Sequence, residues 1–155
     1  MTIDVSPCPA PSDALARDWA RLAALLIGAS GGFSTRIEGE RWHTTFFGSG
    51  TGRLKPQVGR VVGDAAARHV LVRHDALIID DTLHFWCRSA TPVALAEIRA
   101  VAAVPVFATG DLGPNVVIGA LEPVARHWSG PDIDNLWALA AAIRKATDRD
   151  AISLE

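Results

Sequence analysis

Segment 84–88 holds the densest group of side chains that could take part in chemistry. His84, Trp86, Cys87 and Arg88 place an imidazole, an indole, a thiol and a guanidinium close together. Stacking on the indole, reaction of the thiol and a planar guanidinium fork would suit a planar or anionic ligand. Arg99, at the start of a later apolar stretch, is a further ligand-binding candidate. The same pattern also fits an ordinary segment in which Trp86 is core, Cys87 is a small buried apolar residue and Arg88 is solvated.

The histidines and one pair of aspartates suggest other kinds of site. A single histidine can be an axial haem ligand, and His43 and His84 are the positions to test. The five histidines are spread singly along the chain, however, as ordinary exposed or hydrogen-bonded imidazoles are. Asp80 and Asp81 could bind a cation or act as acid and base, but directly after an apolar run they also suit a cap or turn. The spacing places no nucleophile beside a base, so catalysis is not expected.

A glycine-rich segment invites comparison with phosphate-binding loops. Residues 48–52 read Gly-Ser-Gly-Thr-Gly, and Lys55 follows nearby. Glycines allow a close backbone approach to phosphate, but a P-loop needs Gly-Lys-Ser/Thr at the opening of a helix. Here Arg53 and Leu54 separate the last glycine from Lys55, and Pro56 follows, so the segment is expected to be a loop or turn.

Length, composition and charge indicate one compact domain. Of 155 residues, 49% are hydrophobic and 21% charged, an ordinary globular balance that argues against disorder and fibrous architectures. The formal net charge of -2 lacks the basic excess that gathers nucleic acid or anionic lipid, so neither is an expected partner. The apolar runs fall short of the roughly 18 residues of a spanning helix, and no signal-peptide pattern is seen, which makes a cytoplasmic location the default expectation. Cys8 and Cys87 are too few for a disulfide framework and are expected to be reduced thiols.

Hydrophobic periodicity divides the chain into helices and strands. Residues 1–11 are proline-rich and expected to form a flexible leader, and residues 149–155 a C-terminal tail. Asp64 is the expected cap of the second helix. The spacing predicts helices over 12–28, 63–72, 91–97 and from 131 onward, and strands over 33–38, 41–47, 76–79, 101–107 and 116–121. Turn residues at 39–40 and 109–115 predict two antiparallel pairs, strand 33–38 with 41–47 and strand 101–107 with 116–121. The result is one α+β domain over 12–148 around a mostly antiparallel sheet.

The first and last helices carry strong apolar stripes. The stripe of the first helix, which is expected to end at Gly28, consists of Leu15, Trp19, Leu22 and Leu26. The last helix, which begins near Pro131, carries a similar stripe. We expect the two helices to pack together and to leave apolar surface for a second chain, which predicts a homodimer through the terminal helices.

The order of these elements resembles a GAF domain, a small sensory module of histidine kinases, phosphodiesterases, phytochromes and bacterial transcription regulators. Three stretches carry the resemblance: residues 63–81, residues 98–106, and residues 117–121 followed by 128–132. The similarity spans roughly residues 13–147. It implies a three-layer fold with the terminal helices on one face of a twisted sheet. On the other face it implies a ligand pocket, roofed by the segment after strand 76–79.

GAF domains bind cyclic nucleotides, haem, bilins or small metabolites in that pocket, or nothing at all. The residue pattern of the cyclic-nucleotide members is not visible here, and the Cys-His pair usual for a bilin is missing because Arg88 follows Cys87. The resemblance implies a non-catalytic sensory or regulatory module in signal transduction that binds a small molecule; the sequence identifies neither the ligand nor a cofactor.

Two alternatives stay open. One is a small thiol-based redox enzyme similar to the GAF-fold methionine sulfoxide reductases, with Cys87 as nucleophile and Cys8 as resolving thiol. That branch relies on several pocket cysteines, whereas this chain has one within the domain. The other is a structural dimerisation module whose own side chains fill the pocket.

Overall fold

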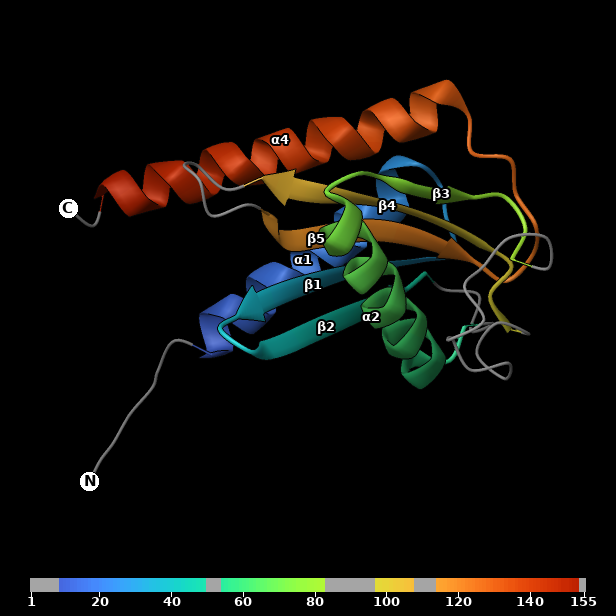
Figure 1. Ribbon diagram of the computed structural model, residues 1–155, viewed down its shortest axis with the longest axis horizontal. Coiled ribbons are helices and arrows are strands. Elements are labelled where there is room, and N and C mark those ends of the chain that lie inside the picture. Colours follow the sequence, from blue (N-terminus) through green and yellow to red (C-terminus); the bar gives the residue numbers. More distant parts are fainter. Residues whose placement is uncertain (1–8, 50–53, 83–96, 108–113, 154–155) are drawn as a thin grey trace.

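The computed structural model describes residues 9–49, 54–82, 97–107 and 114–153 of the chain (Figure 1). Helices and strands follow one another in the order that the sequence predicts. Their bounds are α1 Pro9–Leu26, β1 Gly31–Glu38, β2 Arg41–Gly48, α2 Pro56–Arg73, β3 Leu77–Ile79, β4 Ala100–Phe107, β5 Pro114–Glu122 and α4 Gly130–Ser153. The short helix expected over 91–97 lies almost wholly outside the described residues.

One antiparallel sheet forms the centre of the fold, with the strand order β2-β1-β5-β4-β3. The predicted hairpin of β1 and β2 is confirmed: Phe33 pairs with Phe46, and the turn uses Gly39 at φ +64°, a left-handed conformation that favours glycine. The predicted antiparallel pairing of β4 with β5 is also confirmed. Because β5 lies between β1 and β4, the two hairpins are joined edge to edge into one sheet.

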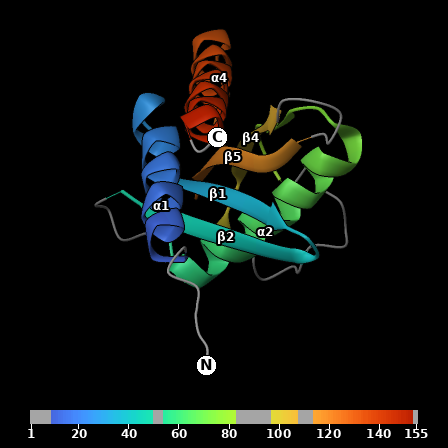
Figure 2. The same ribbon diagram turned by 90° about the vertical axis from the view of Figure 1, so that its left-hand side faces the viewer.

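Helices cover both faces of this sheet and produce three layers (Figures 1 and 2). Helices α1 and α4 lie side by side on one face, and α2 crosses the other. Side chains of β4 alternate between the two faces: Ala102 and Val104 pack under the terminal helices, whereas Val101 and Ala103 pack under α2. A strand buried on both faces must be apolar throughout, which explains the continuous apolar run. The predicted three-layer α+β fold is therefore confirmed.

Helix α1 packs on the sheet through alanines, not through its leucines. Ala16, Ala20, Ala23 and Ala24 are fully buried, and a Cβ added to Gly32 would lie 2.1 Å from the carbonyl oxygen of Ala20. Small residues on both sides let the helix approach β1 closely. The leucine stripe predicted from the sequence consequently faces outward: the exposed fractions are 45% for Leu15, 41% for Leu22 and 47% for Leu26.

Helix α2 begins at Pro56, so the predicted start at residue 63 and the cap by Asp64 are wrong. Proline is favoured in the first turn of a helix because the amide hydrogen it lacks would have no partner there. Asp64 instead pairs with Arg68 one turn later at 3.0 Å. Two glycines inside the helix make room for aromatic rings, since a Cβ at Gly59 would meet Phe46 at 2.2 Å and one at Gly63 would meet Phe33 at 2.9 Å.

Recognisable caps end α1 and begin α4. Gly28, at φ +63°, donates to the carbonyl of Leu25, and Ala29 donates to that of Ala24, which is the Schellman arrangement. At α4 the hydroxyl of Ser129 accepts the amide of Asp132 and the Asp132 carboxylate accepts the amide of Ser129, a reciprocal capping box. Neither α4 nor another helix within the described ranges has an apolar stretch of the length that crossing a membrane requires.

Candidate functional site

The residues predicted to bind a ligand divide into two groups. His84, Trp86, Cys87 and Arg88 lie outside the described residues, as does Cys8. Arg99 is described, and it lies next to the two ends from which segment 83–96 leaves the fold and returns to it. The described part of the candidate site therefore consists of these two ends.

The two ends of segment 83–96 are joined to each other. The Arg99 guanidinium donates from Nε and Nη2 to the two carboxylate oxygens of Asp81, at 2.9 and 2.8 Å. Thr82 adds a backbone bond of 2.7 Å to the carbonyl of Arg99 and a hydroxyl bond of 3.0 Å to that of Ile98. Thr82 and Ile98 are buried. We call these four residues, Asp81, Thr82, Ile98 and Arg99, the neck.

The positive charge of Arg99 stabilises the neck. The hydrogen bond to Asp81 raises the pKa of the Arg99 guanidinium above its ordinary value. Desolvation lowers this pKa, and the negative charge of Asp81 raises it further, so the net shift is upward. Arginine is always charged in proteins, and its planar fork matches a carboxylate in two bonds at once. Asp80 lies in a bend after β3, and both aspartates bind residues far along the chain rather than capping a helix. Within the described residues, no three His, Cys, Asp or Glu side chains converge on a metal site.

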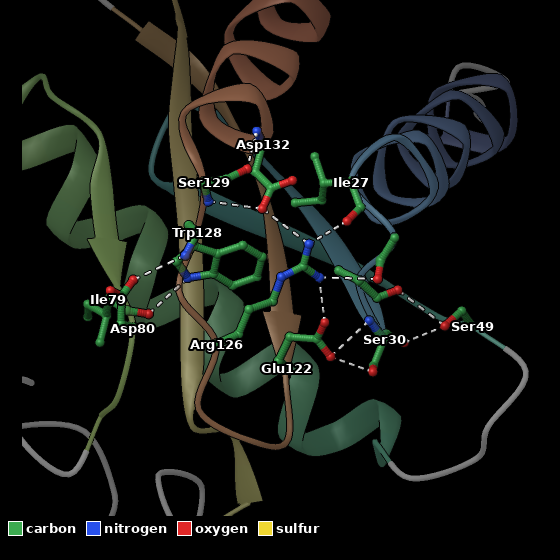
Figure 3. Close-up of polar contacts among 12 residues, drawn as sticks. Ile27, Ser30, Ser49, Ile79, Asp80, Glu122, Arg126, Trp128, Ser129 and Asp132 are labelled. Carbon is green, nitrogen blue, oxygen red and sulfur yellow. Dashed lines mark hydrogen bonds and ion pairs between the residues drawn. The ribbon is translucent and has the colours of Figure 1, made fainter.

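A second polar cluster lies beside the neck and is organised by Arg126 (Figure 3). Its guanidinium donates to the carboxylates of Glu122 at 2.7 Å and Asp132 at 3.2 Å, and to the main-chain carbonyls of Ile27 at 2.6 Å and Gly28 at 3.1 Å. The Arg126 and Glu122 side chains are 23% and 10% exposed, so most of this charge pair is removed from water. A charge in such a place needs several partners, and these supply them.

The Arg126 cluster reaches both terminal helices. Ile27 and Gly28 follow the last turn of α1, where carbonyls have no partner within the helix. Asp132 lies in the first turn of α4, where a negative side chain favours the positive end of the helix dipole. The other oxygen of Glu122 accepts the amide and hydroxyl of Ser30, just before β1. One guanidinium therefore connects the end of α1, the end of β5 and the beginning of α4.

Trp128 and Asp80 connect this cluster to the end of β3. The Arg126 guanidinium lies 4.7 Å from the centroid of the Trp128 ring. The indole N–H donates to the carbonyl of Ile79 at 2.9 Å, and the amide of Arg126 donates to the carbonyl of Asp80 at 3.0 Å. The Asp80 carboxylate also pairs with His127 at 2.9 Å and accepts the amide of Trp128. Asp80 precedes the neck residue Asp81, so neck and Arg126 cluster share one strand end.

Sequence reasoning did not identify Glu122, Arg126 or Trp128 as a cluster. Their signal was visible but weak: a carboxylate ends an apolar strand, and an arginine follows it four residues later. The remaining partners are main-chain carbonyls of residues almost 100 positions earlier, which no local pattern indicates. Two other sequence candidates lie elsewhere. His43 is exposed on β2, and Lys55 forms a long, exposed pair of 3.6 Å with Glu97.

Comparison with known proteins identifies the fold. No family model and no curated protein matches the sequence. Among solved structures, the blue-light-absorbing form of the PixJ GAF domain from Thermosynechococcus elongatus is similar, with a TM-score of 0.64 and 12% identity over 94% of this chain and 92% of that one. The GAF domain of a putative sensor histidine kinase from Pseudomonas syringae pv. tomato has a TM-score of 0.57 and 16% identity, over 93% and 81%.

An enzyme is also among the similar structures. Free methionine-R-sulfoxide reductase from Neisseria meningitidis, solved with its substrate, has a TM-score of 0.61 and 16% identity over 90% of this chain and 80% of that one. At identities this low, the TM-scores establish a shared fold and leave the chemistry open. The chain has the fold of GAF domains, as the sequence resemblance predicts.

Proposed function

We propose that this chain is a GAF-type sensory module that binds a small molecule next to the neck and passes its bound state to the terminal helices. The carrying observation is the shared strand end: Asp80 belongs to the Arg126 cluster, and the next residue, Asp81, closes the neck. A ligand that changes the position of the neck would change contacts that reach α1 and α4.

The proposed ligand contacts are those predicted from the sequence. Four of them, His84, Trp86, Cys87 and Arg88, lie in the chain between the two halves of the neck. The fifth, Arg99, belongs to the neck. An indole to stack on and a guanidinium to pair with an anion suit a planar or anionic molecule. Support for a sensory role comes from the GAF domain of the sensor kinase, whose fold this chain shares.

The second step of the proposal concerns the output. Leu15, Trp19, Leu22 and Leu26 recur at spacings of four, three and four residues, which is the seam spacing of a two-stranded coiled coil. The three leucines are between 41% and 47% exposed. Contiguous exposed apolar residues of this kind mark interaction surfaces. We propose that a second copy of the chain covers this seam in a homodimer, which the ligand state would then adjust.

Two measurements test ligand binding. The protein is purified from its own host, and native mass spectrometry with an absorption spectrum shows whether a haem, bilin or metabolite is retained. A retained species is then removed, and backbone hydrogen exchange is compared with and without it. We expect faster exchange of the ligand-free protein at residues 27–30 and in the first turn of α4, because the carbonyls of Ile27 and Gly28, the Ser30 amide and the Asp132 side chain are held by the Arg126 cluster. Arg99→Gln should release the ligand more readily, whereas Arg41→Gln, an exposed substitution on β2, should not.

Other results would contradict the sensory function. The absence of a retained species, together with no thermal shift from hemin, biliverdin, cyclic nucleotides or a metabolite panel, would remove it. Consumption of free methionine-R-sulfoxide with dithiothreitol, lost in Cys87→Ser, would assign the redox activity suggested by the likeness to the Neisseria meningitidis enzyme.

A further inference from the structure

A small cavity lies between the two terminal helices, at the opposite end of β4 from the neck. It has a volume of about 250 Å³ and is bounded by Trp19 of α1, by β1 at Arg36, by Val106 of β4 and by Ile143 of α4. Val106 follows Arg99 by seven positions, or roughly 23 Å along the strand direction. The cavity is therefore distinct from the ligand site of the proposed function, which lies at the neck.

The walls of this cavity are mostly apolar, but two guanidiniums border it. Trp19, Val106 and Ile143 supply the apolar surface, and Arg36 and Arg144 supply positive charge. One carboxylate, that of Glu38, also lines the cavity, and it forms an ion pair with Arg36. An apolar enclosure with a few charged groups at one side is the usual form of a small-molecule site.

Arg36 is the unusual member of this lining. Its side chain is only 13% exposed, and its two carboxylate partners, Asp13 and Glu38, are 69% and 61% exposed at 3.2 Å each. Pairs to such exposed carboxylates contribute little. The Nε atom is covered by protein and has no hydrogen-bond partner among the residues that the structure describes. A buried donor without an acceptor is costly, so the partners that Arg36 has within the described residues leave its guanidinium incompletely satisfied.

We propose that this cavity between α1 and α4 binds a small amphipathic carboxylate, whose apolar body contacts Trp19 and Ile143 and whose carboxylate pairs with Arg36. The volume lies just below the ~300–1,000 Å³ of typical small-molecule sites, which restricts the occupant to a short aliphatic or aromatic acid. The carboxylate would replace the exposed Asp13 or Glu38 on Arg36. Because such a ligand contacts both terminal helices, its binding would hold them in one relative position.

Octanoate is the probe for the test, and octylamine is its cationic control of the same chain length. Amide, indole and arginine Nε–H signals of the full chain are followed by two-dimensional ¹H–¹⁵N NMR during each titration. We expect octanoate to shift the Trp19 indole, the Arg36 Nε–H and the Ile143 amide saturably, and octylamine to leave them unmoved. If the Arg36 Nε–H does not respond to millimolar octanoate, or if octylamine shifts the same signals equally, the proposal is wrong.

Variants separate binding from folding. Thr147→Trp places a large ring at the exposed rim of the cavity, and Arg36→Gln removes the guanidinium; each should weaken octanoate binding at least about tenfold. Val72→Trp, at an 83% exposed position on α2, is the matched control and should bind as the unmodified chain does. Equal binding by Thr147→Trp, the variant that leaves the core unchanged, would overturn the proposal.

A second copy of the chain is the competing occupant, because Trp19 also belongs to the leucine seam. Sedimentation of the NMR samples decides this: a dimer whose cavity signals ignore octanoate would assign the cavity to the partner chain and contradict a ligand. Octanoate binding should also be unchanged in Arg99→Gln, which tests the neck. Failure at the cavity and failure of the sensory function are thus distinguishable.

Discussion

Arg126 donates a hydrogen bond of 2.6 Å to the main-chain carbonyl of Ile27, although 99 residues separate them. Ile27 follows the last turn of α1, and Arg126 lies between β5 and α4. The same guanidinium contacts Asp132 in the first turn of α4. The terminal helices are therefore connected by a charged side chain as well as by apolar packing, and substitutions there should affect both helices.

Arg126→Gln should destabilise the fold strongly, since it leaves the 10%-exposed Glu122 carboxylate without its cation. We expect the free energy of unfolding to fall by about 2–3 kcal/mol, less than the ~3–5 kcal/mol of a fully buried pair because the guanidinium is 23% exposed. Urea denaturation followed by circular dichroism measures the change. Arg41→Gln, at an exposed position, should stay within about 0.5 kcal/mol of the unmodified chain. Equal effects of the two substitutions would show that the Arg126 cluster contributes no stability.

Gly32→Ala should disrupt the contact between α1 and β1. The added Cβ would lie 2.1 Å from the carbonyl oxygen of Ala20, and main-chain atoms cannot rotate away. We expect a loss of at least about 3 kcal/mol, at the upper end of the range for overpacking. Gly130→Ala is the matched control because nothing lies within 4 Å of its added Cβ; it should be neutral or stabilising by up to about 1 kcal/mol. Thermal melting of the two variants compares them directly.

Trp128→Phe should remove the indole bond to Ile79 and leave that buried carbonyl without its donor. An unsatisfied buried acceptor costs about 1–3 kcal/mol. Trp42→Phe retains an aromatic ring beneath Arg68, whose guanidinium lies 4.3 Å from the Trp42 ring, so it should cost no more than about 1 kcal/mol. If denaturation curves rank the two substitutions in the reverse order, the Trp128 bond does not hold β3 to the α4 connection.

Leu15→Ser combined with Leu22→Ser should weaken self-association without unfolding the chain. Both side chains are more than 40% exposed, so the folded monomer depends little on them, whereas a dimer seam would lose its apolar contacts. Sedimentation equilibrium should show dimer dissociation at least about tenfold easier than in the unmodified chain. Val72→Ser, an exposed substitution on α2, should associate normally. A chain that is monomeric before substitution would contradict the homodimer.

Local sequence patterns predict an element well where a particular residue type is needed for one physical reason. Gly28 ends α1 because a left-handed residue is needed there, and the Ser129 and Asp132 pair begins α4 because it satisfies free amides. The sequence pattern predicts a start of α2 at residue 63 and not at Pro56, because glycine normally weakens helices. At Gly59 that cost is outweighed by the packing of Phe46, a residue of strand β2.

The amino-acid sequence by itself determined the order of helices and strands, the antiparallel hairpins and the layered α+β fold, because periodicity and turn residues act over short distances. The tertiary structure alone decided which face of α1 is buried, since only close contact with Gly32 makes alanines preferable to leucines. It also decided the partners of Arg126 and of Arg99. A charged side chain pairs with whatever the folded sheet brings near it, and those partners lie far away in the chain.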